Sequence, residues 1–373
     1  MSTPNELRAI QACIRNILDR KAVEKHLVAG IIGDAPSHYS KSPPLWNKVF
    51  HALNMEAVYL PFDVDEARLA DFVQALKACD RVMGANVTVP YKVKIIDYLD
   101  DIDEQAKRIK AVNTIIRTRE GRLHGTNTDG RGFIDSLTLP QPGEKSPFVD
   151  SLRGIDVLII GSGGSARAVA FHLGEAVQRG QLLICNRTPE AARDLATEVN
   201  DLFGNAAAIE ETEIERWAPK VGLVVNCTTK GQGGIRRLSD GRITLLEPYS
   251  ALAPAKPAVF PEGDYGKPGF YRAWLSASLS DIEANNRASL NLALTIPPHV
   301  GFCDLIYFPA ETVFLRHGRL SGHKTLNGKG MIIAQAVEAF YHQICREYLH
   351  RLGLYQTETY RRISELMYEA WTG

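Results

Sequence analysis

The sequence lacks a surplus of charge of either sign and any long apolar run. Its 373 residues include 43 Lys and Arg against 43 Asp and Glu, so the formal net charge is zero. A nucleic acid or an anionic membrane surface would favour a basic excess or a basic stripe. Here the basic residues are dispersed among acidic ones, and no apolar run approaches the roughly 20 residues of a membrane helix. We therefore expect no nucleic-acid partner and no membrane association.

Cysteine is also scarce. The six cysteines lie far apart in the sequence, without a CxxC pair or a cluster of Cys and His at the spacing of a zinc site. We expect free thiols and no metal. The N-terminal MSTPNELRAIQ lacks the charged start and the apolar stretch of a secretory signal. Together these features predict a cytoplasmic protein.

What is present is the composition of a globular protein, with 45% hydrophobic and 23% charged residues. At roughly 100–200 residues per domain, the length indicates two domains. Strand and helix patterns alternate up to about residue 137, which predicts an α/β domain with a mainly parallel sheet. The spacing of apolar residues within residues 5–29 predicts a first helix there. Prolines and a glycine interrupt the pattern over residues 138–150 and mark a boundary.

A second α/β unit begins after that boundary with a glycine-rich turn. Gly161, Gly163, Gly164 and Ser165 follow the strand-like DVLII and open a helical pattern. Glycines at such a turn let the backbone approach a pyrophosphate, and the helix N-terminus offers it free N–H groups. This strand–turn–helix context predicts a Rossmann-like dinucleotide-binding domain.

The next predicted strand ends in Asn186, Arg187 and Thr188, and Asn186 comes 25 residues after Gly161. An NAD site usually carries an acidic residue here, to bind the ribose 2′-hydroxyl. This sequence has none, and Arg187 is suited to pairing with a 2′-phosphate. The pattern favours NADP over NAD, with NAD kept as the alternative.

Residues 232–300 differ from the rest, because prolines accompany many Gly and Ser residues. They predict a long inserted loop with one short helix near Trp274–Leu279. A long helix from about Met331 to Leu352 follows. We expect residues 1–138 and 328–373 to form the substrate-binding domain. Residues 139–327 are expected to form the Rossmann-like domain that contains the insertion.

Polar side chains also follow the strand-like segments of the first domain, where α/β folds collect ligand groups. They supply hydroxyls, amides, one ammonium and one carboxylate. This set suits a small ligand with several hydroxyl groups. The residues are Ser40, Ser42, Asn86, Thr88, Lys92, Asn113 and Asp129.

Sequence blocks in this order resemble those of the shikimate dehydrogenases and quinate/shikimate dehydrogenases. The blocks are GDAPSHYSKSP, NVTVPYK, AVNT, GTNTDGRG, GSGGSARA, NRT, NCTTKG, DLIYFPAET and GKGMIIAQAVEAF. The resemblance implies reversible hydride transfer between NADP(H) and shikimate or 3-dehydroshikimate, a step of aromatic amino acid biosynthesis. The ligand it implies is a small polyhydroxylated cyclic carboxylate.

The resemblance also implies roles for individual residues. Lys92 and Asp129 would be the catalytic pair, with Lys92 as the acid and base. Substrate-binding residues would be Ser40, Ser42, Asn86, Thr88, Asn113, Tyr307 and Gln335. Cofactor-binding residues would be Gly161, Gly163, Gly164, Ser165, Asn186, Arg187, Thr188, Thr228, Gly330 and Met331.

Two alternatives stay open at this point. The first is a dehydrogenase of quinate, of both quinate and shikimate, or of an amino analogue, using NAD or NADP. The second is a catalytically silent metabolite sensor on the same fold. Departures from the family pattern bear on the first, because Tyr39 and Trp46 stand where the family usually has His. Nothing in the sequence indicates an oligomeric state.

Overall fold

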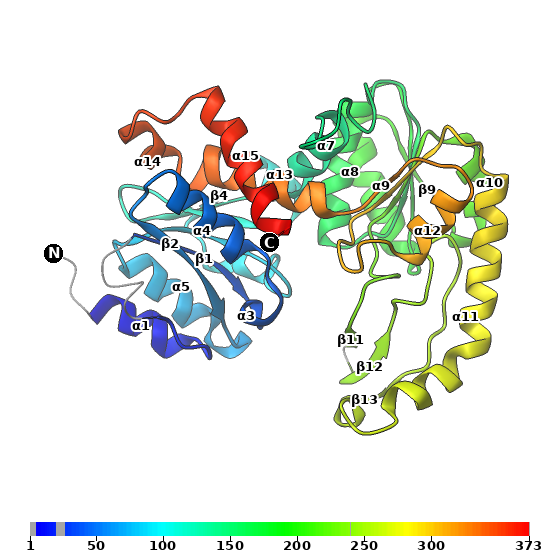
Figure 1. The fold of residues 1–373 in the computed structure, drawn as a ribbon, viewed down its shortest axis with the longest axis horizontal. Helices are drawn as coiled ribbons and strands as arrows, with labels where there is room; N and C mark the ends of the chain where they lie inside the picture. The colour runs from blue at the N-terminus through cyan, green and yellow to red at the C-terminus, as the bar shows by residue number, and fades with distance from the viewer. Residues whose placement is uncertain (1–4, 20–26, 239, 373) are drawn as a thin grey trace. The chain divides into compact units, whose positions relative to one another are not determined.

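The computed structural model describes residues 5–19, 27–238 and 240–372 (Figure 1). The chain divides into two compact units. Unit 1 comprises Met1–Ser136, Pro140–Lys145 and Met331–Gly373, and unit 2 comprises Leu137–Leu139 and Ser146–Gly330. The sequence suggests changes of domain after residues 138 and 327. In the structure the second change falls between Gly330 and Met331.

Unit 1 contains a six-stranded sheet in the order β2-β1-β3-β5-β6-β4. Three pairings are parallel (β1 with β2, β1 with β3, and β4 with β6), whereas β5 runs antiparallel to both β3 and β6. The antiparallel pair β5–β6 brings the residues before β5 and after β6 to the same end of the sheet. The strands are β1 Leu27–Gly33, β2 Ala57–Asp63, β3 Val82–Val87, β4 Asp101–Ile102, β5 Thr114–Arg117 and β6 Leu123–Thr126.

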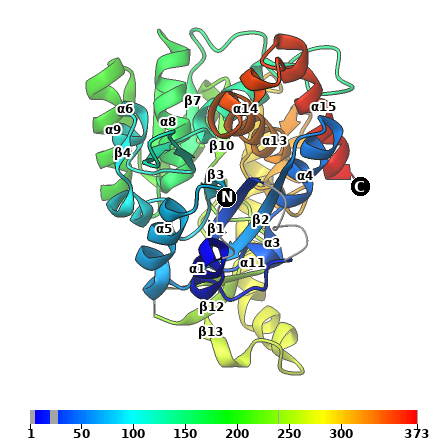
Figure 2. The ribbon, with the colours of Figure 1, turned by 90° about the vertical axis from the view of Figure 1, so that its left-hand side faces the viewer.

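Both faces of this sheet are covered by helices. Alternate side chains along β1 point to opposite faces and pack in two different apolar clusters. Val28 and Ile32 belong to one apolar cluster with α1 and α5, whereas Ala29 and Ile31 belong to another with α4, α13 and α15. Figure 2 shows the two helix layers on either side of β1 and β2. The helices of this unit are α1 Asn5–Cys13, α3 Pro36–Tyr39, α4 Ser42–Ala52, α5 Leu69–Ala78, α6 Glu104–Ile109, α7 Asp129–Thr138, α13 Lys329–Glu338, α14 Arg346–Arg351 and α15 Thr357–Thr372.

The first helix is shorter than predicted. It ends at Cys13, and the expected continuation over residues 20–26 lies outside the described residues. The chain leaves the helix because it pairs with the edge strand β2. Arg15 N–H donates to Asp63 O (2.8 Å), and the Asn16 side chain bonds to Pro61 O (2.9 Å) and Asp63 N–H (2.9 Å). Backbone pairing at a sheet edge thus replaces helical hydrogen bonds that the apolar spacing alone would favour.

Unit 2 contains a six-stranded sheet in the order β15-β14-β10-β7-β8-β9, with every pairing parallel. The strand order reverses between β7 and β10, which is where parallel α/β sheets bind ligands. The Rossmann-like domain is confirmed. Its strands are β7 Val157–Ile160, β8 Leu182–Cys185, β9 Ala206–Ala208, β10 Leu223–Asn226, β14 Gly301–Asp304 and β15 Thr325–Leu326. Its helices are α8 Gly164–Val177, α9 Pro189–Phe203, α10 Ile214–Trp217 and α12 Val313–Leu320.

The insertion is not the loop that its composition predicted. It forms a three-stranded antiparallel sheet of β11 Ile235–Arg237, β12 Arg242–Leu245 and β13 Phe260–Pro261, followed by the 26-residue helix α11 Phe270–Thr295. The N-terminal part of α11 packs Phe270 and Trp274 against β12, and its C-terminal part packs Leu292 and Ala293 on the main core of unit 2. The insertion therefore has a small core of its own and is anchored to the Rossmann-like unit.

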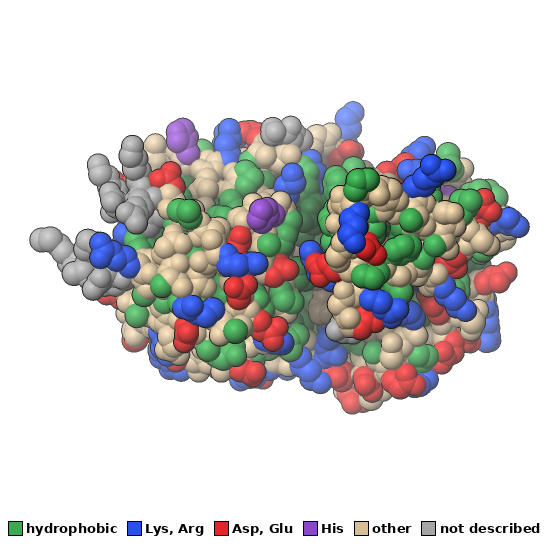
Figure 3. All heavy atoms as spheres, turned by 90° about the horizontal axis from the view of Figure 1, so that it is seen from below, with side chains coloured by type: hydrophobic (Ala, Val, Ile, Leu, Met, Phe, Trp, Pro, Cys, Tyr) green, Lys and Arg blue, Asp and Glu red, His purple; other side chains and the backbone are tan. Residues whose placement is uncertain are grey.

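The surface carries charges of both signs. On the face presented in Figure 3, Lys and Arg side chains are interspersed with Asp and Glu, in keeping with the net charge of zero. Within the described residues, no helix combines the length and apolar character that crossing a membrane requires.

Candidate functional site

Lys92 and Asp129 form an ion pair in unit 1. Lys92 Nζ lies 2.6 Å from Asp129 Oδ2, and the two side chains are 21% and 6% exposed. The other carboxylate oxygen, Oδ1, accepts a hydrogen bond from Asn113 Nδ2 at 2.7 Å. Protein donors therefore hold both oxygens of this carboxylate, so its orientation is fixed before any ligand arrives.

The backbone around this pair is fixed by Asn127. Its Oδ1 accepts the N–H of Asp129 at 3.0 Å, and its Nδ2 donates to Ala111 O at 3.0 Å. The N–H of Val112 donates to Lys92 O at 2.7 Å. These bonds join the segment after β3 to the two segments that flank the β5–β6 pair.

A chain of hydrogen bonds continues from Asn113 toward the serine turn. Asn113 Oδ1 accepts from Thr114 Oγ1 (2.9 Å), which in turn accepts from Asn86 Nδ2 (3.0 Å). Asn86 Oδ1 accepts from Tyr59 OH at 2.7 Å. Burial raises the pKa of Tyr59 well above its usual value, against a smaller opposite effect of its hydrogen bond with Ser42. The network thus runs from Ser42 to Lys92.

Gln335 joins the same network from α13. Its Oε1 lies 3.4 Å from Asn113 Nδ2 and accepts from Thr128 Oγ1 at 3.3 Å. Gly132 of α7 makes this approach feasible, because a Cβ there would meet the backbone nitrogen of Gln335 at 2.6 Å. A side chain at position 132 would therefore push the two helices apart.

The remaining predicted substrate residues of unit 1 lie in the turn after β1 and at the end of β3. Ser40 Oγ accepts the N–H of Ser42 at 3.2 Å. Tyr39 OH donates to Asp34 Oδ1 at 2.9 Å and also lies 3.2 Å from Val89 O, which ties the serine turn to the segment after β3. Thr88 packs its methyl group over Gly33, where an added Cβ would lie 2.7 Å from it.

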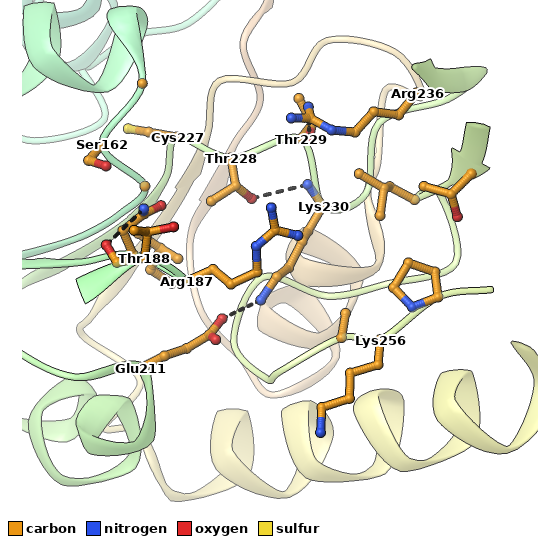
Figure 4. Close-up of a pocket in the computed structure, with 18 of the residues that line it drawn as sticks. Ser162, Arg187, Thr188, Glu211, Cys227, Thr228, Thr229, Lys230, Arg236 and Lys256 are labelled. Atoms are coloured by element: carbon orange, nitrogen blue, oxygen red, sulfur yellow. Dashed lines mark hydrogen bonds and ion pairs between the residues drawn. The ribbon is translucent and has the colours of Figure 1, made fainter. Parts of the chain in front are cut away.

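Unit 2 contains a cavity of about 620 Å³ (Figure 4). Gly161 in its wall has φ +117°, and a Cβ there would lie 3.0 Å from the carbonyl carbon and oxygen of Cys227, so glycine is required. A Cβ at Gly163 would have no neighbour within 4 Å, and no side chain caps the N-terminus of α8. The donors at this helix start are therefore open to an anionic ligand, which fits a pyrophosphate. The predicted cofactor residues in the wall are Gly161, Gly163, Asn186, Arg187, Thr188 and Thr228.

The other predicted cofactor and substrate residues are placed along the chain as follows. Gly164 and Ser165 begin α8. Gly330 and Met331 lie in the first turn of α13, where the chain passes from unit 2 to unit 1. Tyr307 follows β14, and burial raises its pKa.

Sequence reasoning assigned no individual role to several residues of both sites. Thr128 and Thr114 adjoin predicted residues in the motifs GTNTDG and AVNT, so the motifs themselves pointed to them. Tyr59 gave no comparable sign, because it lies in the middle of an apolar strand. Arg236 and Lys256 line the unit 2 cavity from the insertion, which carries no motif.

Comparison with known proteins agrees with this arrangement. The fold is that of an α/β protein with a Rossmann-type unit. Two family profiles match the sequence of the chain. These are the "Shikimate dehydrogenase substrate binding domain" over residues 31–115 and "Shikimate / quinate 5-dehydrogenase" over residues 145–237. The shikimate dehydrogenase (NADP(+)) of Caldanaerobacter subterraneus subsp. tengcongensis is 31% identical over 84% of this chain and 90% of its own length. The chain belongs to the shikimate dehydrogenase family.

Two solved structures share the fold. The shikimate 5-dehydrogenase of Thermus thermophilus, solved with NADP(H) and shikimate, is 27% identical with a TM-score of 0.61, covering 92% of this chain and 99% of that chain. The quinate dehydrogenase of Corynebacterium glutamicum, solved with NAD, is 24% identical with a TM-score of 0.64, covering 92% and 99%. At that identity the second likeness speaks for the fold alone.

Proposed function

We propose that this protein is an NADP-dependent shikimate dehydrogenase, which interconverts shikimate and 3-dehydroshikimate. The observation that carries the proposal is the ion pair of the partly buried Lys92 with the buried Asp129, with both carboxylate oxygens already bonded within the protein. The names of the relatives support the same activity and the same cofactor. A binding protein would need neither an ammonium nor a carboxylate so specifically held.

The ammonium of Lys92 performs the proton transfer. It has three N–H donors, and the hydrogen bond to Asp129 uses one of them. A second donor is available to the carbonyl oxygen of 3-dehydroshikimate, to which Lys92 gives a proton as the carbonyl becomes a hydroxyl. Bound NADPH supplies the hydride for this reduction. In the oxidising direction Lys92 takes the hydroxyl proton back.

The other site residues bind and orient the substrate. We assign the carboxylate to Ser40 and Ser42, and the ring hydroxyls to Thr88, Asn113 and Gln335, with Tyr307 as a further substrate contact. Both ends of the Asn86 amide are engaged by protein groups, so we assign Asn86 to positioning Thr114 and Asn113. The cofactor residues we propose are Gly161, Gly163, Gly164, Ser165, Asn186, Arg187, Thr188, Thr228, Gly330 and Met331.

Quinate is the second candidate substrate, and one observation favours it. Quinate carries an additional hydroxyl on the carbon that bears the carboxylate. Tyr39 lies beside the proposed carboxylate-binding serines and ties their turn to Val89 O. This tyrosine replaces the usual family histidine beside the serines to which we assign the carboxylate, which is the part of the ligand where the two substrates differ.

Steady-state kinetics with four substrate pairs test the proposal. Shikimate or quinate is combined with NADP+ or NAD+, and the absorbance of the reduced nicotinamide is followed. We expect the highest kcat/KM for shikimate with NADP+. A higher value for quinate would make the protein a quinate dehydrogenase, and binding of shikimate without turnover would make it a sensor.

We also propose a cytoplasmic setting. The support is that all six cysteines are free thiols, as expected of a protein in a reducing compartment.

A further inference from the structure

The cavity of unit 2 has two walls of different origin (Figure 4). The loops after the strands of the parallel sheet supply one, which includes Gly161, Arg187 and Thr228. The insertion supplies the other. Its lining residues are Arg236, Leu238, Thr244, Leu246, Ala255, Lys256, Pro257 and Val259. The insertion therefore forms part of the wall of the cavity in its own unit.

The charges that line this cavity are unbalanced. Lys230 is neutralised, because its Nζ lies 2.5 Å from Glu211 Oε1 and both side chains are largely buried. Arg187, Arg236 and Lys256 have no carboxylate at ion-pair distance among residues 5–19, 27–238 and 240–372. Arg187 and Arg236 therefore face one cavity without an internal counter-ion, whereas the Lys256 ammonium points toward α11 in Figure 4.

Arg236 is held in place and still has donors to offer. Its Nη1 donates to Thr229 Oγ1 at 2.6 Å, which leaves most of the five guanidinium N–H groups for a ligand. Partial desolvation and then the like charge of Arg187 lower the pKa of Arg236. An anion bound between the two guanidinium groups would remove that repulsion.

Arg237, the next residue in the sequence, differs from Arg236 in its partners. Arg237 follows on β11, where successive side chains point to opposite faces of the sheet. Its Nε lies 2.6 Å from Glu262 Oε1, so it is paired within the insertion. The two adjacent arginines differ in environment but not in chemistry, which makes Arg237 a matched control for Arg236.

We propose that Arg236 joins Arg187 in binding the phosphomonoester on the adenosine ribose of NADP, so that the insertion helps to set the preference for NADP over NAD. The inference rests on the proposed function. A phosphomonoester carries about two negative charges at neutral pH and accepts hydrogen bonds from guanidinium forks. The apolar residues Leu238, Leu246 and Val259 in the same wall suit the flat face of an adenine.

Binding of nucleotide fragments to the full-length protein tests this inference without catalysis. Isothermal titration calorimetry compares adenosine 2′,5′-bisphosphate with adenosine 5′-monophosphate, which lacks the 2′-phosphate. Adenosine 3′,5′-bisphosphate shows whether the position of the phosphate matters. The proteins are the wild type, Arg236→Gln, Arg236→Lys and the control Arg237→Gln.

We expect Arg236→Gln to raise the Kd of the 2′,5′-bisphosphate about tenfold. The Kd of the monophosphate should stay within twofold, Arg236→Lys should restore part of the loss, and Arg237→Gln should match the wild type. The 3′,5′-bisphosphate should bind more weakly than the 2′,5′-bisphosphate.

Each other outcome has a distinct meaning. If the wild type binds the 2′,5′-bisphosphate no better than the monophosphate, the proposed NADP preference itself fails. If the wild type shows the preference and Arg236→Gln keeps it, the inference alone is overturned. Equal weakening of both nucleotides in Arg236→Gln would also overturn it, because that result indicates a change in the shape of the cavity.

Discussion

The Asp129 carboxylate illustrates how hydrogen bonds fix the orientation of a single residue. Its two oxygens accept from Lys92 and Asn113, and its own N–H is held by Asn127. A carboxylate satisfied in this way cannot turn toward solvent without breaking several bonds. Its orientation in turn fixes the position of the Lys92 ammonium.

Replacement of Lys92 by Ala should lower kcat by roughly 10²–10⁴-fold, because it removes the proposed proton donor and acceptor. The Kd for NADP+ should change less than twofold, because the proposed cofactor cavity lies in unit 2. Stopped-flow turnover and nucleotide titration measure the two quantities. The control is Lys94→Ala, since Lys94 is exposed and pairs with Glu66. Turnover of Lys92→Ala within a few-fold of the wild type would contradict the assignment.

Asp304 is a second residue whose environment has a measurable effect, in this case on how the stability of the fold depends on pH. It is 2% exposed, and burial raises its pKa to about 7 despite hydrogen bonds from Ile306 N–H, Thr312 Oγ1 and Asn226 Nδ2. The unfolded chain releases this proton near pH 4. Between pH 4 and 7 the folded state therefore holds a proton that the unfolded state has lost, so this carboxyl favours folding less as the pH rises.

The Asp304→Asn variant tests this pH dependence, because an amide does not ionise. From pH 4 to pH 8 the free energy of unfolding of the wild type should fall relative to that of Asp304→Asn, by up to about 4 kcal/mol. Urea unfolding at a series of pH values measures the difference. Asp201→Asn, at an exposed position of α9, serves as the control. Parallel pH curves for the wild type and Asp304→Asn would rule out the effect.

Residues of the candidate sites differ in how far the sequence reveals them. Lys92, Asn113 and Asp129 lie in short motifs that follow strand ends, so each motif points to its own residue, and the β5–β6 pair brings two of them together. Arg236 and Lys256 have no motif. Their place in the cavity depends on the folding of the insertion as a whole, which local patterns do not describe.

Among the elements, α11 was the least predictable because of what its buried face contains. That face includes Ser278, Asn285 and Ser289 between its apolar ends. Hydrophobic periodicity therefore disappears in the middle of a 26-residue helix, although the sequence from Phe270 to Thr295 holds no Gly or Pro. These polar residues are held by hydrogen bonds instead: Asn285 bonds to Ser250, Ala253 and Pro254, and Ser289 to Ser250 and His317.

Asn285→Ala should destabilise the insertion. The amide accepts the N–H of Ser250 at 2.8 Å and lies within 3.1 Å of three backbone carbonyl oxygens. Its removal leaves buried backbone groups without partners, at a cost of about 1–3 kcal/mol. Thermal unfolding followed by circular dichroism should show a lower Tm, whereas Arg287→Ala, at an exposed position of the same helix, should not. An unchanged Tm for Asn285→Ala would show that the segment before Lys256 does not depend on α11.

At the scale of the whole molecule, the chain folds into two compact units. The sequence predicted an α/β substrate domain and a Rossmann-like domain, because each motif lies within a recognisable alternation of strand and helix. The return of residues 331–373 to unit 1 is a matter of packing, in which Ile333, Phe340 and Leu366 join the cluster of Trp46. The zero net charge also conceals the local excess of cations in the unit 2 cavity.

Hydrogen–deuterium exchange should distinguish the proposed cofactor site from the proposed substrate site. NADP+ should slow exchange over residues 161–165, 186–188 and 236–246, whereas shikimate should slow it over residues 39–42, 86–92 and 127–130, because bound ligands suppress local opening. An NADP+ effect that spares residues 236–246 would argue against contact between the insertion and the cofactor. The apo protein under the same conditions provides the reference.

The anchoring of α11 at both ends has one more consequence. The helix connects the small core of the insertion to the main core of unit 2, and Asn285 holds the segment that leads to Lys256. The insertion wall of the cavity is thus in place before a nucleotide arrives. Little conformational entropy remains to be lost on binding, so more of the free energy of each contact contributes to the affinity. Loosening this helix should therefore shorten the residence time of the bound nucleotide even when every contacting residue is kept.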